Sequence, residues 1–399
     1  MPRIRICALA ILSILLNHTS FAQTSPGNAI DVAYVVEGST KVGFQVQTYD
    51  VDSHTGYPTP EGQPLRLPVS GSVSQTLTYA FVVPAPGDRF VYVVAETYGT
   101  NRFIWVYPTD TLGVPDAGPI QTVDIPNTWD FQIDPTGKLA YTIGFTSLAA
   151  ATVNVRVFTL DPHTGLLSKT ARTVQTWGTY GPCGNGDPAW IFLDGFNPES
   201  SELYEGWSCV FFDTYGAFYY SSTIDPNQGG LGQPKEIFRW DGSGGDGDGI
   251  YFTARFMIDF YDVGGYGWNA VNVYPLTGGS KPLISCTETM LPACGDAVNL
   301  YADPAGEYLF LQLPTNTMQV ERIDLGAKTI VDTGNYVAEP LFTMSSDRLL
   351  LYTLAPGQRE PYIFGIYVFN PQTGSVQQGG LLPVEGYFDN LATAVRTSN

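Results

Sequence analysis

Residues 160–165 read LDPHTG, and close variants of this phrase return as VDSHTG at 51–56 and FNPQTG at 369–374. In each copy an Asp or Asn side chain can accept hydrogen bonds from the backbone ahead of it, and the final Gly can adopt the positive φ that closes a turn. The residues before the phrase alternate in polarity, as in VNVRVFTL at 153–160, which is the period of a β-strand. The phrase therefore predicts a hairpin turn between two strands.

A second kind of turn alternates with the first along the chain. It occurs in IDPTGKLAYTI (133–143), ADPAGEYLFLQ (302–312), PAPGDRFVYVV (84–94) and MSSDRLLLYTL (344–354). Each copy runs from a turn into a strand that carries an aromatic residue or Leu about five residues on. Together the two turns define a repeated unit of four antiparallel strands.

The last turn of this unit recurs at a spacing of about 53 residues, which is typical of a four-stranded propeller blade. Its copies, several of them degenerate, fall near Ser53, Thr109, Pro162, Pro226, Thr277, Leu325 and Pro371. The sequence therefore predicts an all-β fold, a seven-bladed β-propeller with four antiparallel strands in each blade.

The two ends of the repeat predict how the ring closes. The first unit begins with what reads as its second strand, DVAYVVE (31–37), and the chain ends with an extra strand, NLATAV (390–395). If the C-terminal strand pairs into the first blade, no sheet edge is left exposed at the junction. We therefore expect one propeller domain over residues 23–399.

The first 22 residues have the pattern of a secretory signal peptide. Arg3 and Arg5 precede an apolar run from Ile6 to Leu16, and Ser20-Phe21-Ala22 resembles a cleavage site. The apolar run is shorter than the roughly 20 residues of a membrane-spanning helix. We expect residues 1–22 to be removed and the protein to be exported, to the periplasm or outside the cell.

Charge and cysteine content fit an exported protein. The chain has 38 acidic residues against 19 Lys and Arg, and a net charge of −19 disfavours nucleic acids and anionic membrane surfaces as partners. Beyond the signal peptide an even set of cysteines remains, which predicts two disulfides in an oxidising compartment. Three pairings are open, and proximity in sequence favours Cys183–Cys209 and Cys286–Cys294.

DPTGKLAYT, FTLDPHTGLL and YVFNPQTGSVQQGGLLPV together resemble the seven-bladed propellers of the lactonase type, which include phosphogluconolactonases and YVTN-repeat propellers. The resemblance covers roughly residues 30–396, and its motifs are structural turns that carry little information on activity. It implies a histidine where one blade passes to the next, with Arg and Glu nearby. Here His54 and His163 lie inside the turn phrase, so we expect both to be turn residues, and no Gly-x-Ser-x-Gly elbow is present.

Five of the segments that lead from one blade into the next carry a carboxylate just before the innermost strand. In a propeller such positions surround one mouth of the central channel, where converging carboxylates repel each other unless a cation or a raised pKa relieves them. Ca²⁺ suits such oxygen ligands and is the one cofactor that the sequence suggests. In the alternative, each carboxylate only caps its own loop. The residues are Asp130, Asp187, Asp296, Glu339 and Asp389.

Tryptophans border the same segments, at Trp129, Trp190, Trp207 and Trp268. Trp129 and Trp190 lie next to the carboxylates and are candidate stacking surfaces for a sugar. Packing between blades is the alternative for each ring. The acidic stretch DGSGGDGDG (241–249) lacks the full ligand pattern of an EF-hand loop, so we expect a flexible loop between blades.

Two classes of function follow. The first is an exported, monomeric binding or scaffold propeller that holds a small molecule, a glycan or a protein at the channel mouth. The alternative is a lactonase-type or sugar-modifying hydrolase that uses carboxylates of the channel mouth on a metal-assisted water.

Overall fold

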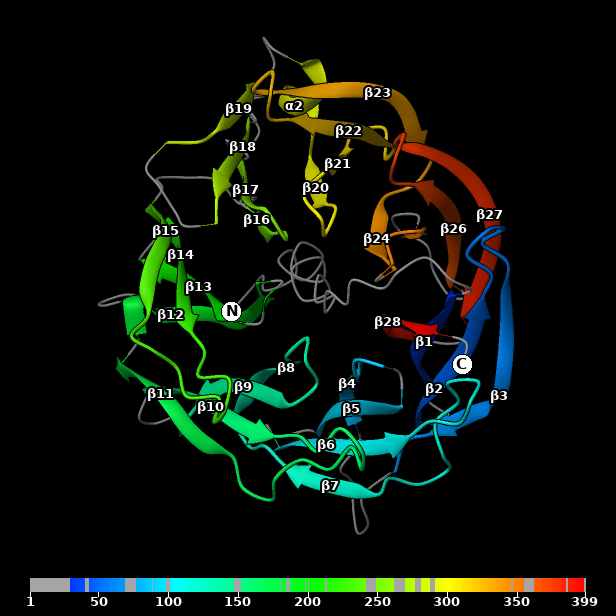
Figure 1. Ribbon diagram of the computed structural model, residues 1–399, viewed down its shortest axis with the longest axis vertical. Helices are drawn as coiled ribbons and strands as arrows, with labels where there is room; N and C mark the ends of the chain where they lie inside the picture. Colours follow the sequence, from blue (N-terminus) through cyan, green and yellow to red (C-terminus); the bar gives the residue numbers. More distant parts are fainter. Residues whose placement is uncertain are drawn as a thin grey trace, which may run out of the picture.

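The computed structural model gives the chain as a ring of seven four-stranded antiparallel sheets (Figure 1). It describes residues 29–39, 43–68, 77–87, 89–97, 101–146, 152–179, 181–183, 187–197, 199, 201–211, 214–241, 249–261, 270–276, 281–287, 291–345, 347–354, 362–384 and 387–397. The predicted signal peptide and most of the acidic stretch at 241–249 lie outside these residues.

Each sheet is one blade, and its strands run outward from the ring axis in chain order, except in blade 1. Blade 1 contains β28 (Tyr387–Thr397), β1 (Ala29–Ser39), β2 (Gly43–Val51) and β3 (Pro58–Arg66). Blade 2 contains β4 (Leu77–Pro84), β5 (Phe90–Thr97), β6 (Asn101–Pro108) and β7 (Gln121–Asp124). Blade 3 contains β8 (Thr128–Ile133), β9 (Leu139–Phe145), β10 (Thr152–Thr159) and β11 (Arg172–Thr179).

Blade 4 contains β12 (Asp187–Phe196), β13 (Glu202–Phe211), β14 (Thr214–Thr223) and β15 (Lys235–Asp241). Blade 5 contains β16 (Gly249–Phe252), β17 (Phe256–Tyr261), β18 (Ala270–Pro275) and β19 (Ile284–Thr287). Blade 6 contains β20 (Asn299–Ala302), β21 (Tyr308–Gln312), β22 (Met318–Asp324) and β23 (Thr329–Val337). Blade 7 contains β24 (Leu341–Met344), β25 (Leu350–Leu354), β26 (Tyr362–Asn370) and β27 (Ser375–Val384).

Helical structure in the described residues is limited to two short segments, the 3₁₀ turn η1 (Gly181–Cys183) and α2 (Pro292–Asp296). No helix in this part of the chain is long and apolar enough to cross a membrane.

The ring closes as the sequence predicted. The C-terminal strand β28 pairs antiparallel with β1, with Val32 opposite Ala394 and Tyr34 opposite Ala392, and becomes the innermost strand of blade 1. The blade therefore combines both ends of the chain, and its inner edge is paired.

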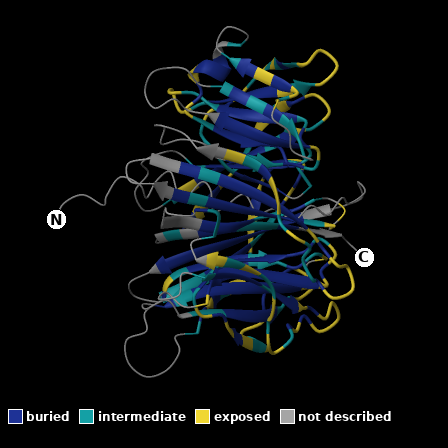
Figure 2. Cartoon of the chain, turned by 90° about the vertical axis from the view of Figure 1, so that its left-hand side faces the viewer, coloured by how far each residue is buried: buried dark blue, intermediate teal, exposed yellow. Residues whose placement is uncertain are grey.

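Strand order places the two kinds of turn on one face of the ring. Because neighbouring strands are antiparallel, the hairpins after the first and third strands of a blade lie at the same edge of the sheet, which we call the turn face. The connections between blades lie at the opposite edge, the connection face. Exposed residues gather in the hairpins at the right-hand edge of Figure 2.

The turn phrase has the predicted geometry. Asp161 Oδ1 accepts hydrogen bonds from the backbone N–H groups of His163 at 2.8 Å and Thr164 at 3.3 Å, and the Gly165 N–H donates to the Asp161 carbonyl at 2.8 Å. Gly165 has a φ of 70°, which explains why the phrase ends in Gly.

The same Gly contacts the preceding blade. The Tyr92 hydroxyl of β5 donates to the Gly165 carbonyl at 2.7 Å, and a Cβ on Gly165 would lie 2.3 Å from the Phe90 ring. Equivalent bonds run from Tyr34 to Gly113 at 2.9 Å and from Tyr141 to Gly229 at 3.1 Å. We call this contact the Tyr–Gly clasp; it joins the second strand of one blade to the outer turn of the next.

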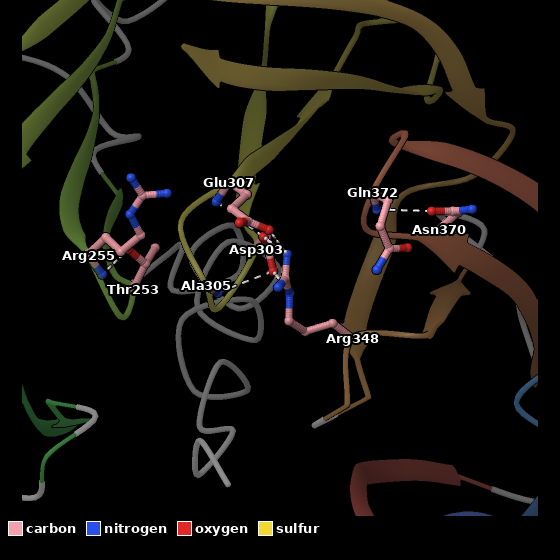
Figure 3. A network of polar contacts seen from close by, with 8 residues as sticks. All are labelled: Thr253, Arg255, Asp303, Ala305, Glu307, Arg348, Asn370 and Gln372. Carbon is pink, nitrogen blue, oxygen red and sulfur yellow. Dashed lines mark hydrogen bonds and ion pairs between the residues drawn. The ribbon is translucent and has the colours of Figure 1, made fainter. Parts of the chain in front are cut away.

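An ion network joins blades 6 and 7 on the turn face (Figure 3). Arg348, in the β24–β25 turn, contacts both carboxylate oxygens of Asp303 at 2.7 Å and one oxygen of Glu307 at 2.7 Å. Asp303 is fully buried, so the guanidinium supplies the charge that this carboxylate needs.

Both predicted disulfides are present. Cys183–Cys209 ties η1 to β13, and Cys286–Cys294 ties β19 to α2. All four cysteines are buried within the hydrophobic clusters between blades, so these disulfides fasten segments of the connection face onto the core.

Candidate functional site

The innermost strands β28, β4, β8, β12, β16, β20 and β24 surround the ring axis, and we call their side chains the inner wall. Polar side chains of this wall link neighbouring blades. Asn390 Oδ1 accepts from the Val82 N–H at 3.3 Å, between blades 1 and 2, and the Tyr251 hydroxyl donates to Asn299 Oδ1 at 3.4 Å, between blades 5 and 6.

Asp130 belongs to this set of links. It is buried in β8, where Oδ1 accepts from the Phe131 N–H at 2.7 Å and Oδ2 from the Leu193 N–H of β12 at 3.0 Å. Two backbone amides thus hold this carboxylate between blades 3 and 4, which is the geometry of a structural link.

The other predicted carboxylates are spread along the connection face. Glu339 is half-buried before β24, where its Oε2 accepts from the Thr353 hydroxyl at 2.8 Å. Asp296 is exposed at the end of α2. Asp187 and Asp389 lie within β12 and β28, and their side chains are outside the described part of the structure.

Among the described residues, no group of three or more His, Cys, Asp or Glu side chains is arranged to hold a metal ion. Since two of the predicted ligands fall outside that part, the five-carboxylate calcium site stays a prediction.

Two of the four candidate tryptophans pack against the core, and the side chains of the other two are not described. Trp129 is half-buried in β8 and meets the Phe145 ring edge-on at 5.4 Å, against the cluster between blades 3 and 4. Trp207 is completely buried in the same cluster. The Trp190 and Trp268 side chains are outside the described residues.

Both histidines of the propeller are turn residues, as the sequence predicted. The backbone N–H groups of His54 and His163 donate to Asp52 and Asp161 at 2.8 Å, and both residues are exposed on the turn face. They lie in the outer hairpins of blades 1 and 3, away from the inner wall.

Sequence reasoning missed Asp194, the most unusual carboxyl of the inner wall. It lies in β12 at a bulge between Leu193 and Gly195, and Gly195 has a φ of 109°. Its Oδ2 is buried and has no hydrogen-bond partner. Burial, with repulsion from Asp130, raises the pKa of Asp194 well above its ordinary value.

The phenol of Tyr251 is a near neighbour of Asp194 on the next blade. Burial raises its pKa, and the charges of Tyr301 and Asp194 add to that effect, so the phenol stays protonated. A bulge can redirect a strand side chain, and an Asp-Gly pair inside a predicted inner strand was the signal available in the sequence.

No protein-family model and no curated protein matches the chain. Among solved structures, a putative 6-phosphogluconolactonase from Bacteroides fragilis is similar with a TM-score of 0.58 at 14% identity, over 93% of this chain and 100% of the other. The periplasmic gluconolactonase of Pseudomonas aeruginosa gives 0.57 at 16% identity, over 92% and 99%. The chain therefore has the seven-bladed propeller fold of the lactonase-like proteins, as its turns predicted.

Proposed function

We propose that this protein is an exported β-propeller that binds a small molecule, a glycan or a protein segment at a mouth of the central channel that the inner wall lines. The observation that carries the proposal is Asp194. Most buried polar groups of a folded protein are hydrogen-bonded, so the buried Asp194 oxygen without a partner leaves one hydrogen-bonding position that a ligand group could satisfy.

The chemistry around Asp194 defines the kind of ligand atom that fits. A protonated carboxyl donates one hydrogen bond, and the phenol oxygen of Tyr251, whose proton points to Asn299, can accept one, so Asp194 and Tyr251 favour an uncharged ligand with hydroxyl groups. The two disulfides support export, because such bonds persist in oxidising compartments.

Calorimetric titration with neutral monosaccharides, their lactones and short glycans tests this function. At least one ligand should bind, Asp194→Ala should abolish its heat of binding, and Thr164→Ala, in the exposed outer hairpin of blade 3, should keep it. Equal binding by Asp194→Ala would overturn the assignment of Asp194.

The alternative function is opening of a lactone, and the raised pKa of Asp194 favours it, because a carboxyl that keeps its proton to a higher pH than usual can act as a general acid. Asp194 would give its proton to the ring oxygen as the acyl C–O bond breaks, while a second carboxylate of the inner wall takes a proton from the attacking water. A pH-stat assay with D-glucono-1,5-lactone checks this. Turnover lost in Asp194→Asn supports a hydrolase, and hydrolysis at the spontaneous rate by the unmodified protein excludes this reaction.

A calcium site at Asp130, Asp187, Asp296, Glu339 and Asp389 is part of the same proposal. Bound Ca²⁺ would stabilise the fold by mass action, by about 2.7 kcal/mol at a hundredfold excess over its dissociation constant. Calcium should raise the melting temperature, chelator should reverse the gain, and Asp187→Asn should reduce it. A melting temperature that changes with neither calcium nor chelator would contradict the calcium site.

A further inference from the structure

Three consecutive blade interfaces each bury a carboxyl group that lacks a cation. The residues that lie opposite them on neighbouring strands belong to the hydrophobic clusters between blades 3 and 4, 4 and 5, and 5 and 6. They are Glu205 in β13, Asp259 in β17 and Glu321 in β22, with exposed fractions of 0%, 7% and 0%.

Glu205 is surrounded by neutral donors. Its oxygens accept from Gln175 Nε2 at 3.0 Å, Trp177 Nε1 at 3.0 Å and the Ser222 hydroxyl at 3.2 Å. Its ionisable neighbour on the next strand is Tyr220, which lies opposite Glu205 and whose ring packs on Trp177. Burial raises the pKa of Glu205 to about 7, although the three donors act in the opposite direction.

Asp259 and Glu321 have fewer partners. Asp259 accepts one bond, from Asn272 Nδ2 at 3.3 Å, and its ionisable neighbour is Tyr274. Neither carboxyl oxygen of Glu321 has a partner, and Asp332 of β23 repels it. Burial raises the pKa of Asp259 to about 6 and that of Glu321 to about 8.

Asp134 is an internal contrast, since it is also buried but is built to hold a negative charge. Its Oδ1 accepts from the backbone N–H groups of Lys138 at 2.9 Å and Leu139 at 2.7 Å, and its Oδ2 accepts from Thr136. The protein therefore supplies charge-stabilising amides to a buried carboxylate of a turn, and does not supply them to the three carboxyls between blades.

We infer that protonated Glu205, Asp259 and Glu321 hold blades 3 to 6 together, so that this sector of the ring is tightest in acid and loosens as the pH rises through neutrality. The three interfaces are consecutive, so the loosening affects one continuous sector. That sector contains β12, so it links the pH of the surroundings to the position of Asp194.

The direction of the pH dependence of stability follows from proton binding. All three groups have a higher pKa in the folded state than in the unfolded state, so the folded state holds more protons between about pH 4 and pH 8. Their contribution to stability is complete below the unfolded pKa values and is lost as the pH passes through the folded ones. Each group can raise the unfolding constant by up to about tenfold per pH unit within its interval.

Thermal melts between pH 5 and pH 8.5 test the inference. The melting temperature should fall with rising pH, and Glu205→Gln, Asp259→Asn and Glu321→Gln should each flatten the fall, with the triple variant flattest. Asp134→Asn should lower the melting temperature at every pH and keep the slope. A triple variant with the unmodified slope would overturn the inference.

Hydrogen exchange on the unmodified protein provides a second measurement that does not depend on variants that fold. After correction for intrinsic rates, amides of β13, β17 and β22 should lose protection between pH 6 and pH 8.5, while those of β5 in blade 2 keep it. Protection that is constant with pH in all four strands would also overturn the inference.

Discussion

The Tyr–Gly clasp shows how single residues set the contact between blades. The Gly of the outer turn needs a positive φ, and it also needs to have no side chain, because Phe90 occupies the space beside Gly165. The Tyr of the preceding blade then fills the remaining space and satisfies the carbonyl of the turn. One position in the phrase thus serves both the turn and the packing of the next blade.

Substitutions at the Tyr–Gly clasp should separate the contribution of the Gly to stability from that of the Tyr hydroxyl. Gly165→Ala combines a left-handed backbone with a steric clash and should cost about 2–4 kcal/mol of unfolding free energy. Tyr92→Phe leaves a buried carbonyl unpaired and should cost about 1–2 kcal/mol. Urea unfolding measures both values.

The exposed Tyr57 is a matched control, because Tyr57→Phe removes a hydroxyl from a side chain that is 67% exposed and should change stability by less than about 0.5 kcal/mol. If Tyr92→Phe proved as harmless as Tyr57→Phe, the hydrogen bond of the clasp would have no part in stability.

The β24–β25 turn departs from its counterparts in the other blades. Gly137 and Gly306 occupy the left-handed position of the equivalent turns, whereas blade 7 places Arg348 there with a φ of 67°. In all three turns the N–H of this residue donates to the carbonyl of the first turn residue, so the backbones are equivalent. The strain at Arg348 is offset by its ion pair with Asp303.

Arg348→Gly should reveal this balance. It relieves a backbone cost of about 1–2 kcal/mol but leaves a buried carboxylate uncompensated, which costs about 3–5 kcal/mol, so the variant should be less stable by about 2–4 kcal/mol. Arg348→Ala should be worse still, because it keeps the strain. Arg322→Ala, at an exposed pair with Asp324, should cost less than about 1 kcal/mol. An Arg348→Gly protein of unmodified stability would contradict this account.

Turns and strands were predictable from sequence because their determinants are local. Asp161 acts on residues two to four positions ahead, and alternation marks the strands on either side. The inner wall was not predictable in the same way. The partner of Asp130 is Leu193, in another blade, and the distinction between a tied carboxylate and the unpartnered Asp194 depends on a bulge in β12. These contacts depend on how neighbouring blades pack against each other, and no short sequence motif encodes that packing.

Closure of the ring depends on one strand. β28 pairs with β1 along most of its length, forms the innermost strand of blade 1, and contributes Asn390, whose side chain accepts from Val82 of blade 2. Leu391 and Ala394 each enter a cluster between blade 1 and a neighbour, Leu391 toward blade 7 and Ala394 toward blade 2. A single strand therefore joins the first and last blades and both adjoining interfaces.

Deleting residues 388–399 should abolish the folded monomer. The deletion removes most of β28, exposes the inner edge of β1, and opens the two hydrophobic clusters that Leu391 and Ala394 complete, so aggregation through the free edge should follow. Size-exclusion chromatography and circular dichroism of the truncated protein measure this. Deleting only residues 398–399, which follow β28, is the matched control and should leave the melting temperature unchanged. A monomeric protein with an unmodified melting temperature after the longer deletion would mean that the six complete blades and β1–β3 hold the ring without the C-terminal strand.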